Sequence, residues 1–114
     1  MSQTEELLNN LIMELRRGAV ILGVLSQLPE SQYGYSLVQI LEAKGFPVEP
    51  GTLYPLLRRL EKQGLLESSW DTSESRPRKY YRHSAKGKVI YEELCEEWQN
   101  LNKIMSVLIE DRKE

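Results

Sequence analysis

The residues of this 114-residue chain that could do chemistry are mainly cationic, and they gather in its middle. Residues 58–88 carry nine basic and four acidic side chains, whereas residues 1–57 carry three and six, and residues 89–114 carry three and seven. The formal net charge is only −2, so the positive charge is concentrated rather than abundant. Because Lys and Arg replace counterions along nucleic-acid phosphates, this stripe is typical of a phosphate-binding surface, although a merely solvated face has the same composition.

Groups that could support catalysis are sparse. The one histidine, His83, and the one cysteine, Cys95, fall on different predicted elements. A polar residue at a strand end and a small residue on a helix account for them better than a catalytic pair does. The sequence has no metal-ligand spacing, no glycine-rich phosphate loop and no nucleophile elbow. We therefore predict that the protein is not an enzyme and has no metal and no cofactor.

The periodicity of apolar residues indicates which elements position the cationic residues. Four helices are expected, from Thr4 to Leu28, from Gly34 to Lys44, from Pro50 to Gly64 and from Ser84 to Glu110. Two strands, Leu66–Trp70 and Arg78–His83, flank a polar loop and predict a β-hairpin. The chain is thus expected to be mainly α with a small β-hairpin, and its second and third helices form a helix-turn-helix.

The third helix has two distinct faces. Its apolar face is formed by Leu53, Leu56, Leu57 and Leu60. Its other side carries basic or hydrogen-bonding residues, namely Thr52, Tyr54, Pro55, Arg58, Arg59 and Lys62. Successive helix residues point about 100° apart, so only one of Arg58 and Arg59 is well placed for a bound groove, and the sequence does not say which. Tyr54 could instead be a core aromatic.

The second strand alternates, with Arg78, Tyr80 and Arg82 on one face and Lys79, Tyr81 and His83 on the other. One of the two tyrosines is therefore expected in the core. Trp70, on the first strand, is expected to pack across the hairpin.

The last helix carries a long apolar stripe. Its members recur at alternating spacings of three and four residues: Tyr91, Leu94, Trp98, Leu101, Met105 and Leu108. This is the rhythm of a coiled-coil seam, which needs a partner helix. The first helix of the same chain, with Leu8, Leu11 and Leu15, could cover part of it. Two long amphipathic helices in so small a chain favour a partner subunit, so we predict a homodimer whose interface includes all nine residues.

Location and domain organisation follow from the same survey. No apolar run approaches the roughly 20 residues that cross a bilayer, and residues 1–6 lack the zones of a secretory signal. Cys95 has no partner for an intrachain disulfide. We expect a cytoplasmic protein with no membrane partner, divided into residues 1–83 around the helix-turn-helix and residues 84–114 as a C-terminal dimerisation helix.

One segment carries a family resemblance. The run Gly51-Thr52-Leu53-Tyr54-Pro55-Leu56-Leu57-Arg58-Arg59-Leu60-Glu61 resembles the recognition helix of the PadR family of transcription regulators. Further matching motifs occur in the family's order: Arg17-Gly18, Gly34-Tyr35-Ser36-Leu37, Gly64-Leu65-Leu66, Trp70, Arg76-Pro77-Arg78-Lys79-Tyr80-Tyr81-Arg82 and Gly87. The single long helix after the hairpin resembles the family's group with a small C-terminal domain.

The resemblance implies a winged helix-turn-helix that binds double-stranded DNA. The third helix would enter the major groove, and the hairpin, as the wing, would lie along phosphates or reach the minor groove. The expected DNA contacts are Tyr35, Thr52, Tyr54, Arg58, Arg59, Lys62, Arg76, Arg78, Lys79 and Arg82. A homodimer would bind a pseudo-palindromic operator. The alternative is a dimeric winged-helix module for protein interaction, without specific DNA binding.

The expected function is a sequence-specific transcriptional regulator, a repressor of a nearby gene that a small aromatic effector releases. Trp98 is the residue expected to bind this effector. Its position in the seam favours simple packing. The resemblance implies instead that Trp98 and its symmetry mate line a cavity for a planar aromatic ligand.

Overall fold

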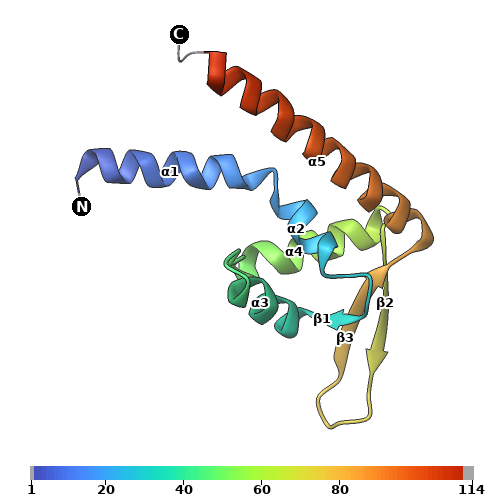
Figure 1. The fold of residues 1–114 in the computed structure, drawn as a ribbon. Coiled ribbons are helices and arrows are strands. Elements are labelled where there is room, and N and C mark those ends of the chain that lie inside the picture. The colour runs from blue at the N-terminus through green and yellow to red at the C-terminus, as the bar shows by residue number, and fades with distance from the viewer. Residues whose placement is uncertain (1, 112–114) are drawn as a thin grey trace.

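The computed structural model describes residues 2–111. Its elements are, in order, α1 (Gln3–Arg17), α2 (Val20–Ser26), β1 (Gln32–Tyr33), α3 (Gly34–Ala43), α4 (Pro50–Lys62), β2 (Leu66–Asp71), β3 (Arg78–His83) and α5 (Ala85–Asp111). The helices α2, α3 and α4 pack beside a small sheet, and α1 and α5 project away from this core (Figure 1). The prediction of a mainly helical chain that ends in a long helix is confirmed.

The first predicted helix is wrong in its extent, because the chain forms two helices there. Glycine is a poor helix former, and after Gly18 the amide of Ala19 donates to the Arg16 carbonyl at 2.9 Å, a tighter turn than that of an α-helix. The start differs as well, since Ser2 and not Thr4 caps α1 by accepting a hydrogen bond from the Glu5 amide at 3.1 Å. The bend separates α2, which packs in the core, from α1, which buries no residue.

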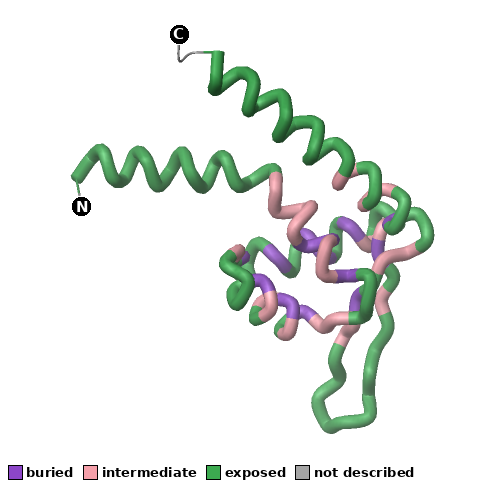
Figure 2. The backbone as a smooth tube through the Cα atoms, in the orientation of Figure 1, coloured by how far each residue is buried: buried purple, intermediate pink, exposed green. Residues whose placement is uncertain are grey.

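The core lies between α2, α3, α4 and the sheet. Its buried side chains are Val24, Leu25, Leu28, Leu37, Leu41, Val48, Leu53, Leu56, Leu57, Leu60, Leu66 and Tyr81. In Figure 2 buried residues recur along these elements, whereas α1, the outer part of α5 and the hairpin tip are exposed throughout. The four predicted inward leucines of α4 are all among the buried residues.

Each of the two helices of the helix-turn-helix ends just before a glycine. Gly45 after α3 and Gly64 after α4 have φ angles of 85° and 82°, in the left-handed region that side chains disfavour. The amide of Phe46 then donates to the Leu41 carbonyl, and the amide of Leu65 to the Leu60 carbonyl, each at 2.9 Å. Both helix ends thereby satisfy carbonyls that would otherwise lack partners.

The predicted hairpin is extended by a third strand that the sequence analysis missed. The antiparallel sheet has the order β1-β3-β2, and Tyr33 of β1 lies opposite Tyr80. Of the two tyrosines in β3, Tyr81 is the core residue. β1 is only two residues long, and its pairing is with a strand far along the chain.

α5 is fastened to the turn that follows α4. Ser84 caps the helix by accepting a hydrogen bond from the Gly87 amide at 2.9 Å, and its own amide donates to the Leu65 carbonyl at 3.0 Å. A Cβ on Gly87 would overlap that same carbonyl, so only glycine permits this close approach. The first turns of α5 therefore lie directly against the root of the hairpin.

Candidate nucleic-acid interface

The outer side of α4 is the centre of the candidate site. Four exposed residues lie opposite its buried leucines, namely Gly51, Pro55, Arg58 and Lys62. Neither Arg58 nor Lys62 forms an ion pair with any residue in the described part of the chain. The most outward positions of α4 are thus held by two unpaired cations, a glycine and a proline.

Arg59 occupies a different environment from Arg58, because it lies at one flank of α4. There an open groove of about 480 Å³ separates this helix from the junction of α1 and α2. The groove is lined by Arg17, Val20, Ile21, Thr52, Pro55, Leu56 and Arg59. Arg59 and Thr52 therefore lie nearer to α1 than to the wing.

Tyr54 lies on the opposite flank of α4, where it packs against α3 but is not part of the buried core. A Cβ on Gly34 would overlap its ring, so the ring packs directly on the start of α3. It is nevertheless partly exposed. The ring of Tyr35, which is exposed on α3, lies 6.4 Å from that of Tyr33. A row of tyrosines thus leads from α3 towards the edge strand.

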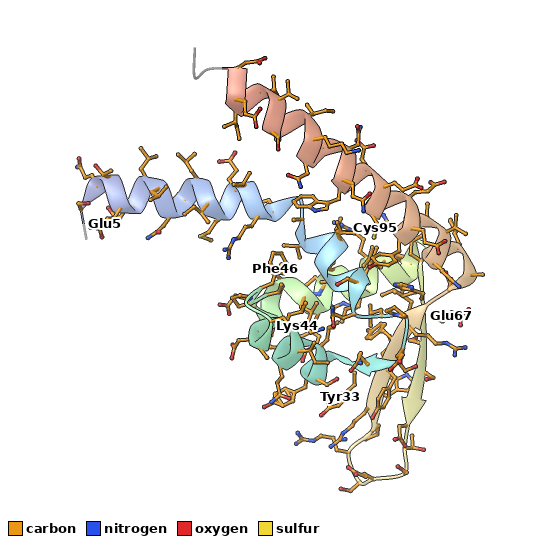
Figure 3. The ribbon with its side chains drawn as sticks, viewed as in Figure 1. Glu5, Tyr33, Lys44, Phe46, Glu67 and Cys95 are labelled. Atoms are coloured by element: carbon orange, nitrogen blue, oxygen red, sulfur yellow. The ribbon has the colours of Figure 1, made fainter. Side chains whose placement is uncertain are left out.

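The wing holds Arg78 in this aromatic row. Its guanidinium lies 4.9 Å from the ring centre of Tyr33, the residue that Figure 3 labels, and the ring centres of Tyr33 and Tyr80 are 5.5 Å apart. A hydrogen bond with Tyr80, and then the charge of Glu74 at 3.4 Å, raise the pKa of Arg78 above its ordinary value. Sequence analysis did not assign Tyr33 or Tyr80 to the site, and the only signal for Tyr80 was that it shares a strand face with Arg78.

The other cations of the wing differ in how they are held. Arg76 is exposed in the loop. Arg82 pairs with Glu67 across the hairpin at 3.4 Å, and both side chains are largely exposed. Figure 3 labels Glu67 on β2. Exposed pairs of this kind are weak, so Arg82 is readily available to another anion.

Lys79 is bound to α4 instead of being free. Its ammonium lies 3.0 Å from Oε1 of Glu61, and the other oxygen of that carboxylate, Oε2, accepts a hydrogen bond from the Ser68 hydroxyl. The hydrogen bonds from Ser68 and Lys79 lower the pKa of Glu61, and the hydrogen bond to Glu61 raises the pKa of Lys79. The ammonium also lies 5.1 Å from the ring centre of Tyr81 and 6.0 Å from that of Trp70. Trp70 is thus a cross-strand neighbour of Lys79, as its predicted packing role requires, but it is mostly exposed.

The predicted dimer seam is exposed over most of its length. Leu8, Leu11 and Leu15 of α1 and Trp98, Leu101, Met105 and Leu108 of α5 all face solvent in the single chain. Tyr91 and Leu94 differ, because they pack against the protein's own core. The exposed apolar surface also includes residues that the heptad pattern omitted: Leu7, Ile12, Met13, Ile104, Val107 and Ile109. A count of all apolar residues on these helices would have found them.

His83 and Cys95, which the sequence analysis did not regard as a catalytic pair, both lie beside Tyr91. His83 lies with Nε2 2.7 Å from the Leu25 carbonyl oxygen and its ring 5.2 Å from that of Tyr91. A hydrogen bond with Cys95 and burial raise the pKa of Tyr91.

Within residues 2–111, no group of three or more His, Cys, Asp or Glu side chains could hold a metal ion. No helix in the described range is long and apolar enough to cross a membrane.

Comparison with known proteins identifies the arrangement. The transcriptional regulator PadR-like family matches residues 21–93. A crystal structure of a PadR family transcriptional regulator from Eggerthella lenta has a TM-score of 0.90 and 46% identity, covering 94% of this chain and 96% of that chain.

Two further relatives agree with this assignment. A PadR-like transcriptional regulator from Bacillus cereus has a TM-score of 0.71 and 32% identity, covering 83% of this chain and 96% of that one. A transcriptional regulator of Mycobacterium tuberculosis is 41% identical over 76 residues, which are 66% of this chain and 71% of the relative. This chain therefore belongs to the PadR-like family of transcriptional regulators, which bind DNA through a winged helix and are not enzymes.

Proposed function

We propose that the protein is a dimeric, sequence-specific repressor in which α4 enters the major groove and the wing lies along the flanking phosphates. The observation that carries the proposal is the outward side of α4, where Arg58 and Lys62 are exposed and unpaired among the described residues. An unpaired guanidinium on an accessible helix face suits bidentate recognition of guanine. The exposed Arg76, Arg78 and Arg82 of the wing suit phosphate contact.

Titration of the protein against labelled duplexes from the region upstream of its own gene tests this proposal. Fluorescence anisotropy at several salt concentrations should give an affinity that falls steeply as salt rises, because binding releases counterions. A shuffled duplex should bind much more weakly. Absence of salt-dependent binding to any duplex would contradict the proposal and favour the protein-interaction module.

The division of the chain is proposed as well: residues 1–83 form the DNA-binding domain, residues 84–114 form the C-terminal dimerisation helix, and α1 of the first part adds to the contact between subunits. Support comes from α1, which buries no residue although six large apolar side chains lie on it. A helix of 15 residues is marginal in water unless it packs against something. A second copy supplies that packing if its α1 and α5 cover the exposed seam.

Repression itself is tested in the cell of origin. Deletion of the gene should raise transcription of an adjacent gene, and restoring the wild-type gene in trans should lower it again. Arg58→Ala in trans should not restore repression. An unchanged or lower transcript in the deletion strain would contradict the repressor role.

The proposed effector is a planar aromatic molecule that stacks between the two Trp98 side chains. Trp98 is half exposed in the single chain, beside other exposed apolar residues of the seam. Stacking between aromatic planes is worth about 0.5–1.5 kcal/mol per pair beyond the area buried, so it favours flat ligands without specific hydrogen bonds. A ligand that separates the subunits would change the spacing of the two α4 helices.

Titration of tryptophan fluorescence with planar aromatic and cationic compounds tests the effector site. Wild type should show saturable quenching that Trp98→Ala abolishes. Trp70 also emits, so Trp70→Phe is the matched control and should keep the saturable signal. Quenching that persists unchanged in Trp98→Ala, or two Trp98 rings packed face to face in the dimer, would leave Trp98 as a packing residue.

A further inference from the structure

We propose that Glu61 and Lys79 set the angle between the wing and α4, so that Lys79 is a positioning residue for DNA binding and not a phosphate contact. This inference rests on the proposed DNA-binding function. It changes the role of Lys79, which the basic composition of the wing places among the DNA contacts. It also gives a role to Glu61, an acidic residue on the helix that binds a polyanion.

The strand register separates Lys79 from the other cations of the wing. Residues paired across antiparallel strands share a face of the sheet, and Lys79 is paired with Trp70, while Tyr81 is paired with Ser68. This is the face that contains the buried Tyr81 and that contacts α4 through Ser68 and Glu61. Arg78 and Arg82 alternate with Lys79 and therefore lie on the other face.

The surroundings of the Glu61–Lys79 pair distinguish it from the other two ion pairs of the described residues. Its nitrogen–oxygen distance is 3.0 Å, and its side chains are 28% and 32% exposed. The Arg78–Glu74 and Arg82–Glu67 pairs are each 3.4 Å apart, with side chains that are 43–67% exposed. Partial burial reduces screening by salt. The pair closest to α4 is therefore the one best able to hold a fixed geometry.

Three further contacts restrict this pair. Ser68 of β2 donates to Glu61, so the carboxylate binds both strands of the hairpin at once. The aromatic rings of Tyr81 and Trp70 lie within 5.1 Å and 6.0 Å of the Lys79 ammonium, at distances typical of cation–π contacts. The carboxylate on α4 thus links β2 and β3 to the recognition helix, and the Lys79 ammonium lies beside Glu61 and the two rings.

Substitution of Glu61 gives a test in which positioning and simple electrostatics predict opposite results. Glu61→Gln removes a negative charge from α4, which on charge alone should tighten DNA binding. We expect instead a loss of about five- to tenfold in affinity for the operator, with a similar loss in Lys79→Met. Glu67→Gln is the matched control, because it removes the same charge from β2 but breaks only an exposed pair. It should bind as tightly as wild type or more tightly.

The charge-swapped double variant Glu61→Lys with Lys79→Glu adds a rescue. It recreates the pair in reverse, so it should recover most of the affinity that Lys79→Met loses. A lysine that contacts phosphate would not be rescued in this way. Affinity in Glu61→Gln at or above that of wild type would overturn the proposal. So would a swapped variant that binds no better than Lys79→Met.

A measurement without DNA keeps the two proposals distinguishable. Hydrogen exchange of the amides from Ser68 to Lys79 should be faster in Glu61→Gln and Lys79→Met than in wild type, and unchanged in Glu67→Gln. If wild type binds no duplex, the proposed function fails while this measurement still tests the link. Equal exchange in all four proteins would overturn the positioning role even where DNA binding is intact.

Discussion

Arg58 and Arg59 are neighbours in sequence, but α4 places them in different environments. Arg58 lies opposite the buried leucines, whereas Arg59 borders the groove beside Arg17. A residue at the outermost line of a recognition helix reaches base edges, and one at the flank reaches the phosphate backbone. We therefore propose that Arg58 contacts bases and that Arg59 contacts the backbone.

The two arginines should give different results on substitution. Arg58→Ala should cost about 1–3 kcal/mol of binding to the operator and reduce the preference for it over shuffled DNA. Arg59→Ala should weaken binding to both duplexes alike and lower the salt slope by about one unit. Anisotropy titrations of both duplexes over a range of salt measure these effects. Loss of preference in Arg59→Ala but not in Arg58→Ala would reverse the assignment.

Gly87 should be sensitive to the addition of a single methyl group. Gly87→Ala places a Cβ onto the Leu65 carbonyl oxygen. This carbonyl cannot move freely, because it accepts a hydrogen bond from the Ser84 amide. We expect a loss of about 1–3 kcal/mol in the free energy of unfolding, measured by urea denaturation. Gly51→Ala is the control, since a Cβ there meets nothing within 4 Å and alanine favours a helix. A Gly87→Ala protein as stable as Gly51→Ala would show that α5 can shift away.

At the scale of elements, the sequence predicted the helix boundaries that are set by residues at the boundary itself. The ends of α3 and α4 followed from Gly45 and Gly64, and the start of α5 followed from Ser84. The break between α1 and α2 was missed because apolar residues continue through it, and the packing of α2 in the core decides the direction of the chain. β1 was missed because two residues carry no periodicity and its pairing with β3 is long-range.

The sequence predicted which residues belong to the candidate site, but not how those residues contact other elements. The residues on the outer side of α4 could be listed from its period, but choosing between Arg58 and Arg59 needed the position of α1. Alternation placed Lys79 on the face of Tyr81, yet its partner Glu61 lies 18 residues away on another element. Contacts between elements depend on tertiary packing, which periodicity does not encode.

The Glu61–Lys79 pair should make stability depend on pH in a defined direction. The folded pKa of Glu61 is lowered below 4.5, so its stabilisation is present above that pH and is lost as pH falls through the lowered value. The folded pKa of Lys79 is raised above 10.5, so its contribution persists below that pH and is lost above it. The pair therefore stabilises the wing across the range between these values. The groups that face the pair are the Ser68 hydroxyl and the rings of Tyr81 and Trp70.

Comparison of wild type with Glu61→Gln by urea denaturation tests this dependence. At pH 7 the variant should be less stable by about 1 kcal/mol or less, because the pair is about one-third exposed. The difference should shrink as pH falls from 4.5 through the lowered folded pKa of Glu61, because the unfolded carboxylate binds a proton before the folded one does. A difference that stayed constant down to pH 3 would mean that Glu61 stabilises the protein through packing and not through charge.

At the scale of the whole molecule, the exposed apolar residues of α1 and α5 should hold two subunits together. Leu101→Lys with Leu108→Lys puts charge into the seam and should yield a monomer in analytical ultracentrifugation. These positions are better suited than Leu94, which packs on the protein's own core. Glu96→Lys with Glu110→Lys is the control, because it introduces two lysines into α5 at positions outside the seam. This control variant should remain dimeric. A double lysine variant that still sediments as a dimer would contradict the seam.

The close contacts of Ser84 and Gly87 with Leu65 hold the start of α5 beside the hairpin, so a rotation of this helix as a rigid body would pivot near Gly87. Trp98 lies about 16 Å along the axis from that point, at 1.5 Å per residue. A sideways displacement of about 1 Å at Trp98 therefore turns a rigid α5 by roughly 3–4°. Only Ser84 separates the end of β3 from the start of α5, and its amide is bonded to Leu65. Such a rotation would reach the root of the wing with no loop between to absorb it.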